Sequence, residues 1–304
     1  MIEVHSLCKQ FGDVAALDDI SFSVESGAIC GFIGPNGAGK TTTMRILATL
    51  EHADSGEAAI NGHSVALEPI QVRQLMGYMP DYYGAYPDMA VSEYLDFFAR
   101  AYRLSAQQRI TRVNDIVDFT ELHPLMSRPV EGLSKGQKQR LSLARSLLSD
   151  PSVLILDEPA AGLDPRARIE LRELLKILAQ QGKTIFISSH ILTELSDLVD
   201  YIVIIDHGKI RFSGRLNELN QTHAGGVLYT LELVSEDEAA RKFLLTRPAV
   251  REVSGEGELL HLRFDEQTEA PEAILSAMIE HGIRLRQFYR RRDDLESVFM
   301  QVTE

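Results

Sequence analysis

The strongest indication of the fold is the stretch Gly34-Pro35-Asn36-Gly37-Ala38-Gly39-Lys40-Thr41, or GPNGAGKT. It fits the pattern G-x-x-x-x-G-K-[ST], whose glycines let successive backbone N–H groups turn toward a chain of phosphates. The apolar run 28–33 precedes it and a predicted helix over 41–50 follows, so a helix N-terminus adds partial positive charge at the same point. Strand, glycine loop and helix in this order predict an α/β fold that binds a phosphorylated ligand.

Individual roles follow from the chemistry of this loop. Lys40 is expected to reach the β and γ phosphates of a nucleotide, and the hydroxyl of Thr41 is expected to bind Mg²⁺. The candidate nucleotide-binding residues of the loop are Gly34, Pro35, Asn36, Gly37, Ala38, Gly39, Lys40, Thr41 and Thr42.

A second stretch, Val153-Leu154-Ile155-Leu156-Asp157-Glu158, places two carboxylates directly after a buried strand. Ligands of open α/β sheets gather at the carboxyl ends of strands. Asp157 is expected to hold the Mg²⁺ shell, often through water, and Glu158 to polarise the attacking water. An apolar run before two acids is weak evidence alone, but together with the glycine loop it predicts hydrolysis of a nucleotide.

The rest of the chain predicts how these pieces are arranged. Strand patterns alternate with turns over the first sixty residues, and Asn61-Gly62 after Ala58–Ile60 predicts a hairpin. Apolar residues at helical spacing fill 91–122, and a further helix is predicted over 134–148. Strands and helices then alternate to about residue 205, which predicts an α/β core with a helical insertion.

A third stretch, Leu133-Ser134-Lys135-Gly136-Gln137, opens that further helix. Ser134 with Gln137 three residues later is a capping box, which by itself needs no functional explanation. The stretch also resembles the LSGGQ signature of ATP-binding-cassette (ABC) ATPases, with Lys135 in place of the first glycine. Both interpretations hold together, because the same cap presents a hydroxyl and free N–H groups to an anion.

The resemblance to the ABC family covers about residues 2 to 220, and the motifs stand in the family's order. It implies a P-loop NTPase (RecA-like) α/β core, an N-terminal antiparallel β subdomain and a helical insertion. Phe11 matches the aromatic residue that stacks on adenine, and the weaker alternative is a plain core residue. The D-loop of the family matches Ala161-Gly162-Leu163-Asp164, and its switch histidine, which touches the γ-phosphate, matches His190.

The resemblance also implies a head-to-tail dimer with ATP and Mg²⁺ as its ligands. The signature loop of one subunit then closes over the nucleotide of the other, so Ser134, Gly136, Gln137 and Asp164 are expected to act in trans. The chain holds one motif set and is expected to pair with a second copy or with a related ATPase. Glu158 and His190 are the expected catalytic residues.

One residue departs from the family pattern. After the run Gly77-Tyr78-Met79-Pro80 the family normally has a glutamine that binds Mg²⁺, whereas this chain has Asp81. Aspartate is shorter and charged, so we hypothesise an indirect, water-mediated role at the metal. The loop that follows carries Tyr82, Tyr83 and Tyr86, which either receive the coupling helix of a membrane partner or simply order the loop.

The end of the chain indicates a branch of the family. Asp293-Asp294-Leu295-Glu296-Ser297-Val298-Phe299 resembles the ending of ATPase subunits that serve ABC-2-type exporters. Glycines at 225 and 226 mark a predicted boundary between an ABC ATPase domain over 1–222, with its insertion at about 88–148, and an accessory domain over 225–304. The order β-α-β-β-α-β predicts a small α+β, ferredoxin-like domain, and a last helix is predicted over 293–302.

Composition limits the partners. The net charge of −13 argues against nucleic acid and anionic lipid. No apolar run approaches the roughly 20 residues that span a bilayer, so we expect a separate transmembrane permease subunit. The expected location is the cytoplasmic face of the cell membrane, reached through that permease. The alternatives are a soluble ABC-type ATPase without a transport role, and a regulator that binds ATP without turnover.

Overall fold

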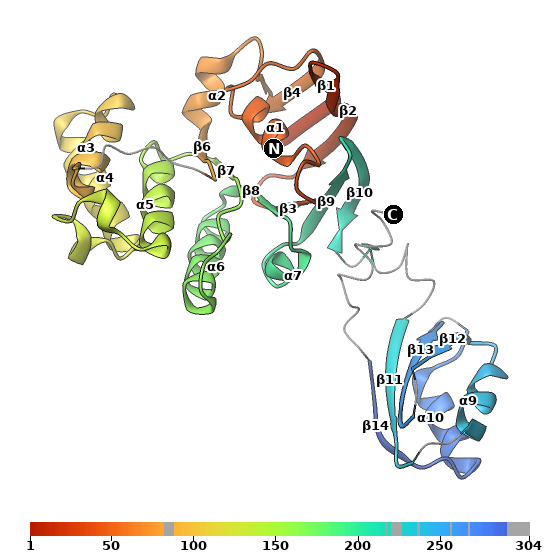
Figure 1. Cartoon of the computed structure of the whole chain (residues 1–304). Helices are drawn as coiled ribbons and strands as arrows, with labels where there is room; N and C mark the ends of the chain where they lie inside the picture. Colours follow the sequence, from red (N-terminus) through yellow and green to blue (C-terminus); the bar gives the residue numbers. More distant parts are fainter. Residues whose placement is uncertain are drawn as a thin grey trace. The chain divides into compact units, whose positions relative to one another are not determined.

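The computed structural model describes residues 1–81, 88–216, 218–219, 227–235, 238–255, 257–266 and 268–290. The chain divides into two compact units, Met1–Ser213 and Gly214–Glu304 (Figure 1). No helix among the residues described in these ranges combines the length and the apolar character that crossing a membrane requires.

The first unit begins with a four-stranded sheet in the order β2-β1-β4-β5. Its strands are β1 (Ile2–Phe11), β2 (Val14–Val24), β4 (Ser55–Ile60) and β5 (His63–Ser64). Strands β4 and β5 form the predicted hairpin, and Asn61 (φ 50°) and Gly62 (φ 81°) both take the left-handed conformation that such a turn requires. The predicted N-terminal antiparallel β subdomain is therefore confirmed.

The second sheet of this unit has six strands in the order β10-β9-β3-β8-β7-β6. The strands are β3 (Ile29–Ile33), β6 (Met76–Met79), β7 (Val153–Leu156), β8 (Thr184–Ser189), β9 (Tyr201–Asp206) and β10 (Lys209–Arg215). Helix α1 (Lys40–Leu47) leads from β3 to the first sheet, and α2 (Pro69–Leu75) leads from that sheet back to β6. Helices α6 (Pro165–Gln180) and α7 (Leu192–Leu195) connect β7 to β8 and β8 to β9. Neighbours β3, β6, β7, β8 and β9 pair in parallel, so the loops after these strands meet at one edge.

The helical insertion separates β6 from β7. It contains α3 (Val91–Ala101), α4 (Ala106–Phe119), α5 (Lys135–Leu147) and two short 3₁₀ turns, His123–Leu125 and Val130–Gly132. The helical pattern predicted over 91–122 is two helices, because Arg103 takes φ 60° and Ser105 begins a new helix by capping the N–H of Gln108. Ile110 is 61% exposed, so it lies outside the apolar face expected for it.

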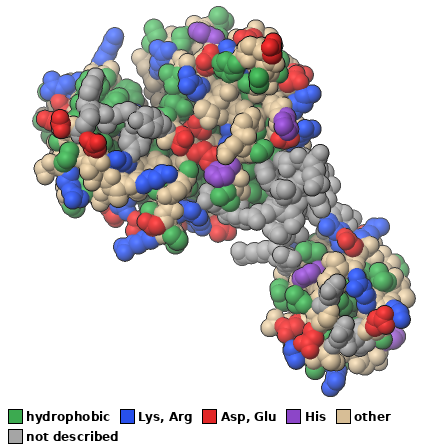
Figure 2. Space-filling view, in the orientation of Figure 1, with side chains coloured by type: hydrophobic (Ala, Val, Ile, Leu, Met, Phe, Trp, Pro, Cys, Tyr) green, Lys and Arg blue, Asp and Glu red, His purple; other side chains and the backbone are tan. Residues whose placement is uncertain are grey.

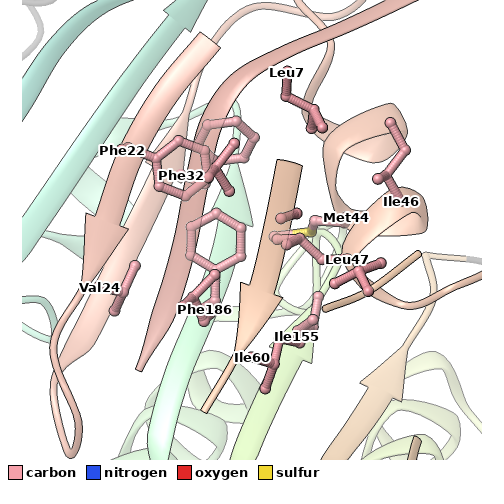
Figure 3. Packing of buried hydrophobic residues seen from close by; sticks show 14 of the residues in the cluster. Leu7, Phe22, Val24, Phe32, Met44, Ile46, Leu47, Ile60, Ile155 and Phe186 are labelled. Atoms are coloured by element: carbon pink, nitrogen blue, oxygen red, sulfur yellow. The ribbon is translucent and has the colours of Figure 1, made fainter. Parts of the chain in front are cut away.

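Aromatic rings fill the space between the two sheets. Phe22, Phe32 and Phe186 come from β2, β3 and β8, and their ring centroids lie 5.1 to 5.6 Å apart (Figure 3). This is the separation that favours offset and tilted aromatic contacts. Met44 and Leu47 of α1 are fully buried in the same cluster. This packing fixes β3 and α1 relative to each other, and it therefore holds the glycine loop that joins them in place.

The second unit is a four-stranded antiparallel sheet with two helices. Its elements are β11 (Val227–Leu233), α9 (Glu238–Leu245), β12 (Val250–Ser254), β13 (Leu259–Phe264), α10 (Pro271–Glu280) and β14 (Leu285–Arg290). The strand order is β12-β13-β11-β14, and both helices lie on one face of the sheet (Figure 1). This is the predicted ferredoxin-like arrangement. The helix predicted over 293–302 lies outside the described residues.

Candidate functional site

A cavity of about 450 Å³ opens where β3, β6, β7 and β8 end. Of the residues predicted to bind or hydrolyse the nucleotide, those that line it are Asn36, Gly37, Gly39, Lys40, Thr41, Thr42, Asp81, Glu158 and His190. These residues come from four segments that are far apart in the sequence, and all four segments line the same cavity. Ala161 of the D-loop also lines it, as do four residues that were not expected from the sequence: Val14, Ala15, Ala16 and His207.

The glycine loop can be built only from glycine at two points. Gly39 has φ 111°, and a Cβ there would lie 2.7 Å from the carbonyl oxygen of Ala16. A Cβ at Gly34 would lie 2.2 Å from the carbonyl oxygen of Ile205. The tight loop orients the buried ammonium of Lys40, which donates to the carbonyl oxygens of Gly34 (2.7 Å) and Pro35 (3.2 Å). Lys40 is thus held at the loop before any phosphate arrives.

The carboxylate of Glu158 lies between the ammonium of Lys40 and the imidazole of His190. Its Oε1 is 3.3 Å from Nζ of Lys40, and its Oε2 is 2.8 Å from Nδ1 of His190. The backbone of Glu158 has φ 48°, a left-handed conformation that costs a non-glycine residue of order 1–3 kcal/mol. Strain of this kind collects at functional sites, and here it turns the carboxylate toward the cavity.

Asp157 is almost fully buried, with 1% of its surface exposed. Its Oδ1 accepts a hydrogen bond of 2.8 Å from Ser188, whereas Oδ2 has no hydrogen-bond partner within the described part of the chain. Burial raises the pKa of Asp157, hydrogen bonds from Ser188 and Thr41 oppose the rise, and the charges of Asp81 and Glu158 add to it. A buried carboxylate oxygen without a partner beside a threonine hydroxyl fits the donor set that Mg²⁺ prefers.

Ser188 was missed as a site residue. Its hydroxyl donates to Asp157 and accepts from the backbone N–H of Glu158 at 2.8 Å, so one side chain holds both carboxylate residues. A signal was present in the sequence, because Ser188 closes the apolar strand that precedes His190. Residues at the ends of neighbouring parallel strands lie close together, but the neighbour relation of β7 and β8 appears only in the fold.

Asp81 follows β6 and is exposed at the cavity wall. The strand before it is tied to the helical insertion by Arg145 of α5, which donates to the carbonyl oxygen of Tyr78 (3.2 Å) and to the hydroxyl of Tyr94 (3.3 Å). Burial raises the pKa of Tyr78 to about 12, so its phenol stays neutral at physiological pH. The three loop tyrosines Tyr82, Tyr83 and Tyr86 lie outside the described residues.

The signature stretch caps α5. The Ser134 hydroxyl accepts from the N–H of Gln137 (3.3 Å), and the Gln137 side chain accepts from the N–H of Ser134 (3.0 Å). Asp164 caps α6 in the same way by accepting from the N–H of Ala167 at 2.9 Å. Of the four described residues expected to act in trans (Ser134, Gly136, Gln137 and Asp164), none lines the cavity of its own chain.

Phe11 is 48% exposed, so the alternative that it is a plain core residue is wrong. The ammonium of Lys9 lies 5.0 Å from its ring centroid and is itself held by Glu51 (3.1 Å) and Asp54 (3.3 Å). One face of the ring therefore meets a cation, and Val14, three residues further on, lines the cavity.

Comparisons with known proteins agree with this geometry. The sequence model of the ABC transporter family matches residues 17–161 of this chain. The Nod factor export ATP-binding protein I of Ralstonia nicotianae (strain ATCC BAA-1114 / GMI1000) is 34% identical over 303 residues, covering 100% of this chain and 94% of that protein. A solved ATP-binding subunit of an ABC transporter is 31% identical, with a TM-score of 0.66, covering 73% of this chain and 92% of the other.

A second solved structure shares the fold at lower identity. It is the dimeric ATP-binding cassette MJ0796 in a post-hydrolysis state with ADP and Pi, 23% identical with a TM-score of 0.65, covering 71% of this chain and 99% of the other. The resemblance read from the sequence, including its export branch, is confirmed by the full-length relative. The chain therefore belongs to the ABC transporter family, as an ATP-binding subunit that hydrolyses ATP.

Proposed function

We propose that this chain powers export by ATP-driven closure of a dimer, working with a separate transmembrane permease subunit. The observation that carries the proposal is the carboxylate of Glu158, held between Lys40 (3.3 Å) and His190 (2.8 Å) at the wall of the phosphate-binding loop. A base, a cation and a histidine in contact at the site of a γ-phosphate suit hydrolysis and are not needed for binding alone.

ATP binding changes the partner of Lys40. Its ammonium is fixed by the carbonyl oxygens of Gly34 and Pro35 and also faces Glu158. The β and γ phosphates carry more negative charge than one carboxylate and therefore attract the ammonium more strongly. Glu158 then loses its cation and becomes free to accept a proton from the attacking water.

Glu158 acts as the general base in this scheme. Ser188 accepts from its backbone N–H, which holds the backbone of this residue in place while the partners of its carboxylate change. His190 contacts Oε2 of Glu158 and lines the same cavity, so it can orient the carboxylate and meet the γ-phosphate. The remaining residues of the loop, from Gly34 to Thr42, bind the phosphates through backbone N–H groups and hydroxyls.

Thr41, Asp157 and Asp81 are the proposed Mg²⁺-binding residues. Mg²⁺ usually binds one or two carboxylates together with substrate phosphates and water, and when bound it neutralises the charge that develops on the phosphates. Asp157 supplies a buried carboxylate oxygen without a partner, and Asp81, whose charge acts on Asp157, supplies a second carboxylate that lines the cavity.

The proposed dimer is head to tail. Ser134 and Gln137 cap α5 and Asp164 caps α6. Neither these residues nor Gly136 line the cavity of their own chain, which leaves them to the nucleotide of a partner. The partner is a second copy or a related ATPase. Nucleic acid is not an expected partner, and Figure 2 supports this with Lys and Arg side chains interspersed among Asp and Glu over the visible face.

We also propose the domain assignment and location that this function requires. Residues 1–222 are the ABC ATPase domain, with the helical insertion at about 88–148, and 225–304 are an accessory domain. The subunit works at the cytoplasmic face of the cell membrane, held there by the permease.

The chemistry is tested by replacing the base. Glu158→Gln removes the proton acceptor but keeps the shape, so turnover is expected to fall by about 10²- to 10⁴-fold. ATP binding should persist, and ATP should trap a dimer that gel filtration detects. Glu173→Gln is the matched control, because Glu173 lies exposed on α6 beside Lys176 and away from the cavity. Near-normal hydrolysis by Glu158→Gln would show that another group is the base.

The transport role is tested by purification from membranes. The full chain is expected to co-purify with an integral membrane protein, and ATPase activity should respond to that protein. If the chain purifies without a membrane partner and its ATPase responds to DNA or RNA, the alternative of an ABC ATPase without a transport role is correct.

A further inference from the structure

The side chain of Lys135 lies against the D-loop of its own chain. A Cβ placed on Gly162 would be 2.4 Å from Nζ of Lys135, 3.4 Å from its Cε and 3.6 Å from its Cδ. Gly162 also has φ 64°, so glycine there satisfies both the backbone and the lysine that packs on it. Lys135 stands at the position where the signature has a glycine, so a glycine there would leave Gly162 uncovered.

The D-loop connects this contact to the catalytic residue. Ala161 lines the cavity, and its N–H donates to the carbonyl oxygen of Glu158 at 3.1 Å. Gly162 is the next residue along the chain. A shift of Gly162 therefore moves the turn that sets the left-handed backbone of Glu158.

The ammonium of Lys135 is available to a new partner. Lys135 is exposed, and within the described part of the chain it forms no ion pair and no side-chain hydrogen bond. The next signature residue is packed closely, since a Cβ on Gly136 would lie 3.2 Å from Cβ of Ala167 on α6. The lysine head is thus the part of this contact that can move most easily.

We propose that Lys135 is a positioning residue that couples the two ATP sites of the dimer, an inference that rests on the proposed head-to-tail arrangement. Without nucleotide in the partner, Lys135 covers Gly162 and holds the D-loop in the conformation in which Glu158 faces Lys40. Phosphates bound in the partner attract the ammonium away from Gly162. The D-loop is then released, and Glu158 can take the position needed for hydrolysis.

The test compares ATPase rates of the full chain across ATP concentrations. Two coupled sites give a Hill coefficient above 1 and at most about 2. Lys135→Ala is expected to lower it to about 1, whereas Lys135→Arg, which keeps a long cationic side chain, should retain the value of the unmodified chain. Lys138→Ala removes the same charge from the same helix and should leave cooperativity unchanged. ATP binding by single copies, measured with a fluorescent nucleotide, should be equal in all four proteins.

The Gly162→Ala variant is a second, independent test of the coupling between the two ATP sites. Its methyl group would displace the ammonium, so this variant should lose cooperativity as Lys135→Ala does, and the double variant should lose no more than either alone. An unchanged Hill coefficient in Lys135→Ala, or in Gly162→Ala, overturns the coupling. A Hill coefficient of 1 in the unmodified chain also overturns it.

The proposed dimer is tested separately, by whether ATP makes Glu158→Gln dimerise. If Glu158→Gln forms no ATP-dependent dimer, the head-to-tail arrangement fails and the coupling fails with it. If that dimer forms and the Lys135 variants stay cooperative, only the coupling is wrong.

Discussion

Ser188→Ala is expected to damage both the stability and the activity of the first unit. The side chain is 1% exposed and makes two hydrogen bonds of 2.8 Å, one to Oδ1 of Asp157 and one from the N–H of Glu158. Alanine fits the space but leaves a buried carboxylate oxygen and a largely buried N–H without partners. The loss combines a charge-assisted bond and a neutral bond.

The size of the effect follows from these two bonds. A hydrogen bond to a charged group contributes about 1.5–3 kcal/mol and a neutral one about 0.5–1.5 kcal/mol, so unfolding should become easier by about 2–4 kcal/mol. At about 2–4 °C per kcal/mol for a unit of this size, the melting temperature should fall by about 5–15 °C. The value of kcat should fall as well, because Glu158 loses the contact that fixes its backbone.

Ser142→Ala is the matched control. Ser142 is also a fully buried serine of the first unit, but its hydroxyl has no hydrogen-bond partner within the described residues. Its replacement should leave the melting temperature unchanged or slightly raised, because an unsatisfied polar atom disappears. Since the chain has no tryptophan, unfolding is best followed by circular dichroism or calorimetry. Equal melting temperatures of the two variants would refute the role assigned to Ser188.

Three further predictions address the nucleotide site. Asp81→Ala should lower transport per ATP hydrolysed by about tenfold while ATP affinity changes little, measured in vesicles that contain the permease; an unchanged transport rate would remove Asp81 from the mechanism. Phe11→Ala should weaken ATP binding by about 5- to 150-fold in titration calorimetry, because a stacked base contributes about 1–3 kcal/mol; equal affinity would exclude stacking. Gly39→Ala should destabilise the first unit by more than about 2 kcal/mol and abolish ATP binding, because φ 111° is strained and the Cβ meets Ala16. Gly132→Ala, whose Cβ has its nearest neighbour at 3.7 Å, should unfold at nearly the normal temperature.

Much of the fold followed from local patterns. The hairpin at Asn61-Gly62 was predictable because two left-handed residues are favoured only in such turns. The βαββαβ order of the second unit was predictable because hydrophobic periodicity separates strands from helices. The break between α3 and α4 was harder to predict, because Arg103 adopts a left-handed conformation that is uncommon for arginine.

The candidate site, like the fold, could be predicted only in part. The glycine loop around Lys40 and the carboxylates after β7 were predictable from the sequence, because each motif is continuous in the chain and stands at the end of its own strand. Three contacts became visible in the folded chain alone: Ser188 holds both Asp157 and Glu158, Glu158 lies between Lys40 and His190, and Lys135 covers Gly162. Such contacts depend on which strands become neighbours and on their register, and the sheet order β10-β9-β3-β8-β7-β6 is not the order of the chain. Side chains separated by many residues meet only when that order is in place.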